Sequence, residues 1–289
     1  MSSSNPRQRD LDLGSPLPSP PLTATADGSP MPDQTPAALA PPEPVSRTHR
    51  LVLATDLDGT FLGGSEAERD ALYEYLKTWR DRVLLVFVTG RDLAFIRDLT
   101  ADGRVPEPDF VIGDVGTTVV DGRTHEPLAA VQGPIERLWG DSTTRVKAML
   151  EGEPGLTLQP VMGDRRVSYY YDPEALRPET IEKVQAAGFD VILSAGVYFD
   201  VMPKGIAKGP TLLRFIETLY LDPGNVLVAG DTLNDLSLFE TGLDGVAVGN
   251  SEPDLVARIR DLENVQHSAH AGCAGIADAI RRFGKTLED

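Results

Sequence analysis

The segment that most constrains this chain is LVLATDLDGTFL, from Leu51 to Leu62, in which an apolar run stops at two aspartates, Asp56 and Asp58. Leu51 to Ala54 is continuously apolar, which is typical of a parallel strand buried on both faces. Gly59 lets the backbone turn sharply after that strand. Open α/β sheets bind ligands at the carboxyl ends of their strands, so the sequence predicts a ligand site at this pair of carboxylates.

Two carboxylates placed this close repel each other, and one of them is pushed to protonate unless a cation lies nearby. A divalent cation keeps both ionised, and hard oxygen ligands in a tight turn suit Mg²⁺, which also binds substrate phosphates. The alternative from Asp56 and Asp58 alone is an Asp-rich turn that caps the next helix. The rest of the chain has to decide between these two interpretations.

Composition excludes several classes of protein. With 289 residues and 41% hydrophobic content, the chain can bury a full core and has room for two domains. Its formal net charge of -17 argues against a surface for nucleic acid or anionic membrane, so an anionic substrate must be met by a few local cations or a metal. The single cysteine, Cys273, and the lack of an apolar run of transmembrane length predict a cytoplasmic protein without disulfides.

The first 48 residues differ in composition from the rest. Eleven of the 23 prolines fall there, among Ser, Thr, Ala and Gly, so this segment has too little apolar surface to fold. We therefore predict a disordered tail at residues 1–48. Whether Met31 is the true start stays open at this point.

Apolar strands alternate with helical patterns from Arg50 onward. The predicted core strands are residues 51–54, 82–88, 110–112, 225–229 and 246–248. Ser65 followed by Glu68 is a capping-box signature that opens the first helix. Alternating strands and helices predict an α/β fold with a Rossmann-like, doubly wound parallel sheet.

The rhythm changes at residues 123–203. A helix near residues 145–150 precedes two strands, a second helix follows, and two more strands complete the segment; the predicted ranges are 156–161, 166–172, 178–187, 191–194 and 198–202. This αββαββ order predicts an α+β cap domain inserted between two core parts, residues 49–122 and 204–289.

Polar residues follow the ends of the predicted core strands or open the helix after the cap. They are Asp56, Asp58, Thr89, Lys208, Asp231, Asn234 and Asp235. Plainer alternatives exist: Thr89 as a helix N-cap, Lys208 as a solvated lysine, and Asp231 with Asp235 as charges that cap a helix. Because the carboxyl ends of parallel strands share one edge of a sheet, their joint occurrence favours a single site.

These motifs resemble those of the haloacid dehalogenase (HAD) superfamily, in the same order and spacing from Leu51 to about Phe283. DLDGT is similar to the first motif, VTGR to the second, the Lys208–Gly209 pair to the third and GDTLND to the fourth. The insert resembles the cap of the branch that holds phosphatases of sucrose phosphate, mannosylfructose phosphate and glucosylglycerol phosphate, on the strength of IGDVGT, RVSYYYD and YFDVMPKGIAKG.

The resemblance implies a role for each catalytic residue. Asp56 would attack phosphorus, form an aspartyl-phosphate and bind Mg²⁺ through its other oxygen. Asp58 would protonate the leaving sugar oxygen, later take a proton from water, and bind the metal through its main-chain carbonyl. Asp231 would bind the metal directly, and Lys208 would neutralise the charge that develops on the phosphoryl group.

Two further groups of residues follow from the same resemblance. Thr89, with Gly90 and Arg91 in its turn, would bind the phosphoryl oxygens, as helix N-termini do. Asn234 and Asp235 would orient the lysine and the metal-bound water without touching the substrate.

Substrate choice is expected to lie in the cap. Alternate residues of the strand RVSYYYD point to opposite faces, and Arg166, Ser168 and Tyr170 share one of them. We expect one face to pack on the cap helices and a tyrosine of this strand to reach the sugar. Arg166, Ser168 and Tyr170 are therefore the candidate substrate-binding residues, and the alternative is that the strand only packs.

The leading hypothesis is a Mg²⁺-dependent phosphatase of a phosphorylated disaccharide or glycoside. Asp58 argues for phosphate esters, because superfamily members that cleave carbon–halogen bonds lack this second aspartate. A phosphosugar mutase and a catalytically idle scaffold that recruits partners through the Pro-rich tail are the alternatives. A glycosyltransferase of the same pathway is the expected protein partner.

Overall fold

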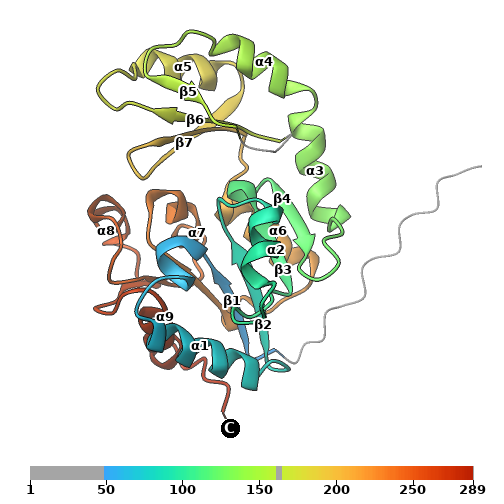
Figure 1. Cartoon of the computed structure of the whole chain (residues 1–289), viewed down its shortest axis with the longest axis vertical. Coiled ribbons are helices and arrows are strands. Elements are labelled where there is room, and N and C mark those ends of the chain that lie inside the picture. Colours follow the sequence, from blue (N-terminus) through green and yellow to red (C-terminus); the bar gives the residue numbers. More distant parts are fainter. Residues whose placement is uncertain (1–48, 161–164, 289) are drawn as a thin grey trace, which may run out of the picture. The chain divides into compact units, whose positions relative to one another are not determined.

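Two β-sheets organise the part of the chain that the structure describes. The computed structural model describes residues 49–160 and 165–288. The predicted tail at residues 1–48, including Met31, lies outside the described residues. The larger sheet has seven strands and the smaller one four, and helices pack on both (Figure 1).

The larger sheet is the predicted doubly wound core. Its strand order is β11, β10, β9, β1, β2, β3, β4. In that order the strands span Val265–His267, Asp244–Ala247, Val226–Gly230, Leu51–Thr55, Val83–Val88, Phe110–Gly113 and Thr118–Asp121. Every residue of β1, β2 and β9 is buried, as their continuous apolar runs predict.

The two outermost strands of this sheet were not among the predicted strands. β4 pairs antiparallel with β3, whereas the other neighbouring strands are parallel. It returns along β3 after a short helical turn, η2 (Asp114–Gly116). β11 is three residues long and mostly polar, so neither strand carries a long apolar run for periodicity to detect.

Helices cover both faces of the core sheet. One face packs against α1, α2 and α9, which span Glu66–Thr78, Leu93–Thr100 and Gly272–Arg282. The other packs against α3, α6, α7 and α8, which span Ala129–Trp139, Lys208–Thr218, Leu236–Phe239 and Pro253–Ile259. Among the described residues, we find no helix with both the length and the apolar character that crossing a membrane requires.

The predicted capping box opens α1. The Ser65 side chain accepts a hydrogen bond from the backbone N–H of Glu68 at 3.3 Å. The Glu68 carboxylate in turn accepts from the backbone N–H of Ser65 at 2.7 Å. Two N–H groups that the helix itself leaves without partners are thereby satisfied, which fixes where the chain enters the helix after the β1 turn.

The smaller sheet has the predicted αββαββ order. Its antiparallel strands lie in the order β5, β6, β8, β7, and they span Leu156–Leu158, Val167–Tyr171, Tyr198–Pro203 and Phe189–Ser194. α4 (Ser142–Met149) and α5 (Pro178–Ala186) pack on one of its faces. β5 ends three residues before the predicted boundary, and residues 161–164 lie outside the described range.

Helix α3, which the sequence did not predict, belongs to both hydrophobic cores. Val131 and Ile135 are buried in the core of the large sheet, near α6. Trp139, at the last position of the same helix, is buried in the core of the small sheet and stacks edge-on against Phe189. One continuous helix therefore connects the two sheets.

Gly209 allows α6 and α7 to approach each other closely. A Cβ atom at this position would lie 1.8 Å from the backbone carbonyl oxygen of Ser237 in α7. The Gly209 N–H also donates to the Ser237 hydroxyl at 3.1 Å. Because Lys208 is the first residue of α6, this contact fixes where its side chain starts.

We predict that Gly209→Ala lowers the free energy of unfolding by about 2–3 kcal/mol, because the added methyl group forces α6 away from α7. Thermal unfolding should show a Tm about 5–10 °C below that of the parent protein. Gly133→Ala is the matched control, since Gly133 lies within α3 and its Cβ would meet only the end of the flexible Arg137 side chain. A Gly209→Ala protein as stable as the control would contradict the close packing.

Candidate active site

A buried ion cluster lies where β1 and β9 end and α6 begins. The Lys208 ammonium is 2.7 Å from Oδ1 of Asp56 and 2.6 Å from Oδ1 of Asp235. Asp56 follows β1, Asp235 lies in the turn after β9, and the side chains of Lys208 and Asp235 are fully buried. The structure thus brings together residues that are 27 and 152 positions apart in the sequence.

Both carboxylate oxygens of Asp235 accept hydrogen bonds within this cluster. Its Oδ1 accepts from Lys208, while its Oδ2 accepts the backbone N–H groups of Asp231 at 3.0 Å and Thr232 at 3.1 Å. Both oxygens are therefore engaged in holding the lysine and the loop that carries Asp231. An orienting role of Asp235 toward the lysine and a metal-bound water stays a prediction.

Three carboxylates converge here and form a candidate metal site. Oxygen atoms of Asp56, Asp231 and Asp235 all lie within 4.8 Å of one another. Asp231 is 7% exposed and accepts a hydrogen bond from the Thr60 hydroxyl at 2.8 Å. When all three carboxylates are ionised they outweigh the single ammonium, and a divalent cation would neutralise the excess negative charge. Since Asp235 is already engaged, Asp56 and Asp231 are better placed as ligands.

The buried charges shift one another's pKa values. Burial raises the pKa of Asp56 to about 8, although the ion pair with Lys208 opposes this rise and the charge of Asp235 adds to it. Burial, together with the charge of Asp235, raises the pKa of Asp231 to about 7. The two carboxylates raise the pKa of Lys208 despite its burial, so the lysine stays charged.

Asp58 is not among the converging carboxylates and pairs with Arg91. The guanidinium donates from Nε to Oδ2 at 2.7 Å and from Nη2 to Oδ1 at 2.9 Å. About half of each side chain is exposed. The two aspartates of the sequence motif, which Leu57 separates, thus occupy different environments: Asp56 is buried against a lysine, and Asp58 is held by an arginine at the surface.

The turn after β2 lies beside the end of β1. The Thr89 hydroxyl is buried and accepts from the backbone N–H of Arg91 at 3.2 Å. The carbonyl of Gly90 accepts from Arg166 of the small sheet at 3.0 Å. Phosphoryl binding by Thr89, Gly90 and Arg91 stays a prediction.

Arg166, Ser168 and Tyr170 point away from the cap helices. Arg166 Nη1 is 2.9 Å from Oδ1 of Asp200, an oxygen that also accepts from the Ser168 hydroxyl. Tyr169 points to the opposite face, where it is buried among the residues that contact α4 and α5. One face therefore packs, as expected, and the other carries polar groups.

A pair of tyrosines extends this polar face. Tyr170 and Tyr198 are paired across β6 and β8, with ring centroids 6.1 Å apart, and are 44% and 40% exposed. Tyr198 interacts electrostatically with Arg91, which places it near the arginine that holds Asp58. Sequence reasoning missed Tyr198, although its alternation with Asp200 along β8 would have placed both on one face.

Asn250 is a second residue that sequence reasoning missed. Its side-chain amide donates to the carbonyl of Gly59 at 3.0 Å and accepts from the backbone N–H of Gly272 at 2.9 Å. It also lies 3.5 Å from Asp231. Asn250 follows β10, so the rule that polar residues after core strands gather at one edge would have found it. The predicted Asn234 is near this edge, and its buried Oδ1 has no hydrogen-bond partner among the described residues.

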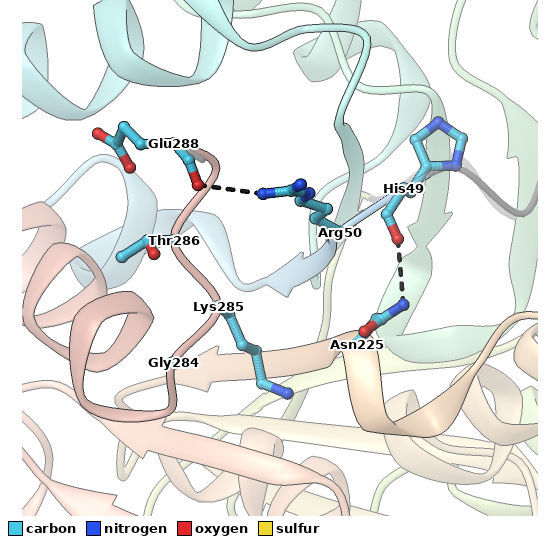
Figure 2. A pocket seen from close by; sticks show the side chains of 7 residues that line it. All are labelled: His49, Arg50, Asn225, Gly284, Lys285, Thr286 and Glu288. Carbon is cyan, nitrogen blue, oxygen red and sulfur yellow. Dashed lines mark hydrogen bonds between the residues drawn. The ribbon is translucent and has the colours of Figure 1, made fainter.

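A separate cavity of about 400 Å³ opens at the opposite edge of the core sheet, where β1 begins and β9 is preceded by Asn225 (Figure 2). Its lining residues are His49, Arg50, Asn225, Gly284, Lys285, Thr286 and Glu288. The Arg50 guanidinium donates to the carbonyl of Glu288 at 3.1 Å across it. Asp56 follows the other end of β1, so this cavity is not part of the candidate active site.

Comparison with known proteins agrees with this arrangement. Residues 49–284 match the family model of sucrose-6F-phosphate phosphohydrolase. The chain belongs to this family. It is 43% identical over 236 residues to the glucosylglycerol-phosphate synthase of Pseudomonas anguilliseptica, and 30% identical over 253 residues to sucrose-phosphatase 1 of Nicotiana tabacum. In both cases the similarity covers 81% of this chain, but the family member described here spans only 31% and 59% of those two proteins.

A solved structure shares the fold of this family member. It is the sucrose-phosphatase of Synechocystis in complex with sucrose and phosphate, with a TM-score of 0.74 and 27% sequence identity. The match covers 82% of this chain and 98% of the solved one. The HAD-type α/β core with a cap, expected from the sequence, is confirmed.

We predict that the metal-free family member loses thermal stability as pH rises from about 5.5 to about 8.5. The folded-state pKa values of Asp56 and Asp231 lie above the ordinary carboxyl value. Such groups stabilise the fold fully at low pH and lose that contribution as pH passes through the folded pKa. Carboxyls with a lowered pKa, such as Glu68, are already ionised where this interval starts.

Thermal unfolding in a chelator across this interval is the measurement. Asp231→Asn removes one of the two titrating groups, so its Tm should fall less steeply with pH than that of the parent protein. A Tm that rises over the same interval, or an unchanged slope in Asp231→Asn, would contradict the pKa assignments.

Proposed function

We propose that this chain is a Mg²⁺-dependent phosphatase of phosphorylated disaccharides or glycosides. The observation that carries the proposal is the position of Asp56, which Lys208 holds by one carboxylate oxygen at the carboxyl end of β1. The other oxygen lies outside this ion pair. A carboxylate fixed beside a buried cation is suited to attack a phosphoryl group, because the cation reduces the repulsion between the two anions.

The reaction would proceed in two displacements. In the first, an oxygen of Asp56 forms a bond to phosphorus while the bond to the sugar oxygen breaks, and Asp58 gives that oxygen a proton. In the second, water attacks the aspartyl-phosphate, Asp58 takes a proton from the water, and inorganic phosphate leaves with the Asp56 carboxylate restored. Lys208 stabilises the negative charge in both steps.

Asp58 can play this part only after it leaves Arg91. Both of its oxygens accept from the guanidinium in the present arrangement. An incoming phosphate offers Arg91 another anionic partner, so substrate binding would free Asp58 to face the leaving oxygen. Thr89, buried at the start of the same turn, would then supply its hydroxyl to a phosphoryl oxygen.

Mg²⁺ would be held by Asp56, Asp231 and the main-chain carbonyl of Asp58. Hard carboxylate and carbonyl oxygens are its usual ligands, and when bound it would neutralise phosphoryl charge that Lys208 alone cannot. The convergence of Asp56 and Asp231 in a buried site with excess negative charge supports this assignment. Asn234 and Asp235 would orient the groups around it.

The substrate class is supported by the cap and by the relatives. The polar face of residues 123–203 carries Tyr170, Tyr198, Ser168 and Arg166, and aromatic plates beside hydrogen-bonding groups suit sugars. The relatives are named for sucrose phosphate and glucosylglycerol phosphate, and the Synechocystis enzyme was solved with sucrose and phosphate. We assign sugar recognition to this cap domain and catalysis to residues 49–122 and 204–289.

A glycosyltransferase is the proposed partner. Glycosyl transfer to a sugar phosphate is reversible, and removal of the phosphate would draw it forward. The Pseudomonas relative is named a synthase, and 69% of its length lies beyond the region that this chain spans, which leaves room for a second activity.

A cytoplasmic location is part of the same proposal. The single cysteine, Cys273, is buried and fits the reducing conditions of the cytoplasm.

We predict that the protein releases inorganic phosphate from at least one of sucrose 6-phosphate, glucosylglycerol phosphate and mannosylfructose phosphate. Asp56→Asn should abolish release, because an amide cannot form the aspartyl-phosphate. Asp98→Asn, at an exposed position of α2, is the control and should retain full activity. Isomerised sugar phosphate in place of free phosphate would favour a mutase, and no turnover of any kind an idle scaffold.

Metal dependence gives a separate prediction. Removal of divalent cations should abolish phosphate release, and Mg²⁺ should restore it. Asp231→Asn should raise the Mg²⁺ concentration needed for half-maximal rate by about tenfold or more, because it removes a charged ligand. Titration of the rate with Mg²⁺ measures this, and full activity in the presence of a chelator would exclude the metal.

A further inference from the structure

Two consecutive arginines of the small sheet hold the turn between β3 and β4 of the core. Arg165 donates from Nε to the carbonyl of Thr117 at 3.1 Å and from Nη2 to the Thr118 hydroxyl at 3.1 Å. Arg166 donates from Nη2 to Oδ1 of Asp114 at 3.1 Å. Both arginines directly precede β6, and the three residues named here belong to the core, so these bonds join the two sheets.

Arg166 connects three segments of the chain through one guanidinium. Besides Asp114, it donates to the carbonyl of Gly90 in the predicted phosphate-binding turn and to Asp200 of β8. Arg166 and Asp114 are 7% and 6% exposed. The second oxygen of Asp114 accepts from the Thr118 hydroxyl at 2.7 Å, so its carboxylate is held from both sides.

The turn that Asp114 opens also contacts the start of α6. A Cβ atom at Gly116 would lie 2.6 Å from the carbonyl carbon of Ala207 and 2.9 Å from the backbone nitrogen of Lys208. The carbonyl of Gly116 accepts from the Thr211 hydroxyl at 2.9 Å. A displacement of this turn would therefore also displace the backbone of the buried Lys208.

Stability alone does not explain this arrangement. Asp114 and Val115 have φ values of 52° and 58°, a conformation that is costly for residues other than glycine and most of all for a β-branched one. Buried ion pairs rarely stabilise a fold more than apolar side chains of the same size would. The Nε of Arg166 is also buried without a hydrogen-bond partner among the described residues. Three unfavourable features coincide at one contact between cap and core.

We propose that Asp114 is a positioning residue that, through Arg166, couples the seating of the cap to the phosphate-binding turn at Gly90 and to the backbone of Lys208. This inference rests on the proposed phosphatase function. Asp114 makes no hydrogen bond with Asp56 or Asp58, the two predicted reacting groups. It acts by fixing the Arg166 guanidinium, which donates to the carbonyl of Gly90. Hydrolysis should depend most on the ion pair of Asp114 with Arg166 when the cap has to close over a large leaving group.

The test compares two substrates in Asp114→Asn, which keeps the shape of the side chain and removes its charge. For the sugar phosphate that the parent protein hydrolyses fastest, kcat/KM should fall by about ten- to hundredfold. For acetyl phosphate, whose leaving group is too small to need the cap, it should fall clearly less, by no more than about fivefold, because this substrate still uses the phosphate-binding turn but not the cap. A general loss of structure would lower both values equally, and equal losses would overturn the proposal.

Asp109→Asn is the matched control. It breaks the ion pair of Asp109 with Arg80, whose two bonds of 2.6 Å lie within the core and do not involve the cap. Its Tm should fall because a partly buried ion pair is lost, whereas its preference for sugar phosphate over acetyl phosphate should stay that of the parent protein. A changed preference in Asp109→Asn would overturn the proposal.

Hydrogen–deuterium exchange on the same proteins separates this inference from the proposed function. In Asp114→Asn, exchange should become faster in peptides that cover Thr89 to Arg91 and in β6, and should stay unchanged in α1. If the parent protein hydrolyses no sugar phosphate but this exchange pattern appears, the phosphatase proposal fails and the coupling stands. If exchange is unchanged around Gly90, the coupling fails whatever the enzyme hydrolyses.

Discussion

The ammonium of Lys208 is the interaction on which the rest of the site depends. It is fully buried, and the carboxylates of Asp56 and Asp235 are the partners that make its burial tolerable. Removing either partner would leave the ammonium with one carboxylate in a fully buried site, and breaking a buried ion pair costs about 3–5 kcal/mol. The same two bonds tie the end of β1, the turn after β9 and the start of α6 together. The same ion cluster therefore stabilises the fold and positions the candidate catalytic groups. The close approach of α6 to α7 at Gly209 fixes where Lys208 starts and so supports both roles.

Much of the core could be predicted because its signals are local. Continuous apolar runs identified β1, β2 and β9, and the Ser65 capping box located the start of α1. β4, β11 and α3 escaped prediction for physical reasons. The two strands are short and lie at the edges of the sheet, and α3 has Gly133 and Pro134 in its middle, residues that normally argue against a helix. Their formation depends on tertiary packing that no short window of sequence contains.

The candidate site divides in the same way. The rule that polar residues after parallel strands meet at one edge correctly gathered Asp56, Lys208, Asp231 and Asp235. The same rule does not predict which side chains form ion pairs with one another. The bonds from Arg91 to Asp58 and from Arg166 to Asp114 span 33 and 52 positions, and they depend on rotamers and on how the cap is seated. The same limit applies to Tyr198, whose relation to Arg91 appears only once β8 lies beside β6.

The sharing of α3 between two hydrophobic cores has a mechanical consequence. An eleven-residue helix is about 16 Å long, and a tilt of about 10° at its base moves its far end by about 3 Å. Val131 and Ile135 anchor the base among core side chains, while Trp139 carries the far end into the other core. The helix is thus fixed at one end in the core of the large sheet, and its other end moves with the small sheet. A change of side-chain volume around Val131 and Ile135 would alter the angle at which α3 meets the small sheet. Under the proposed function, substitutions that never touch a sugar would thereby change the preference for one.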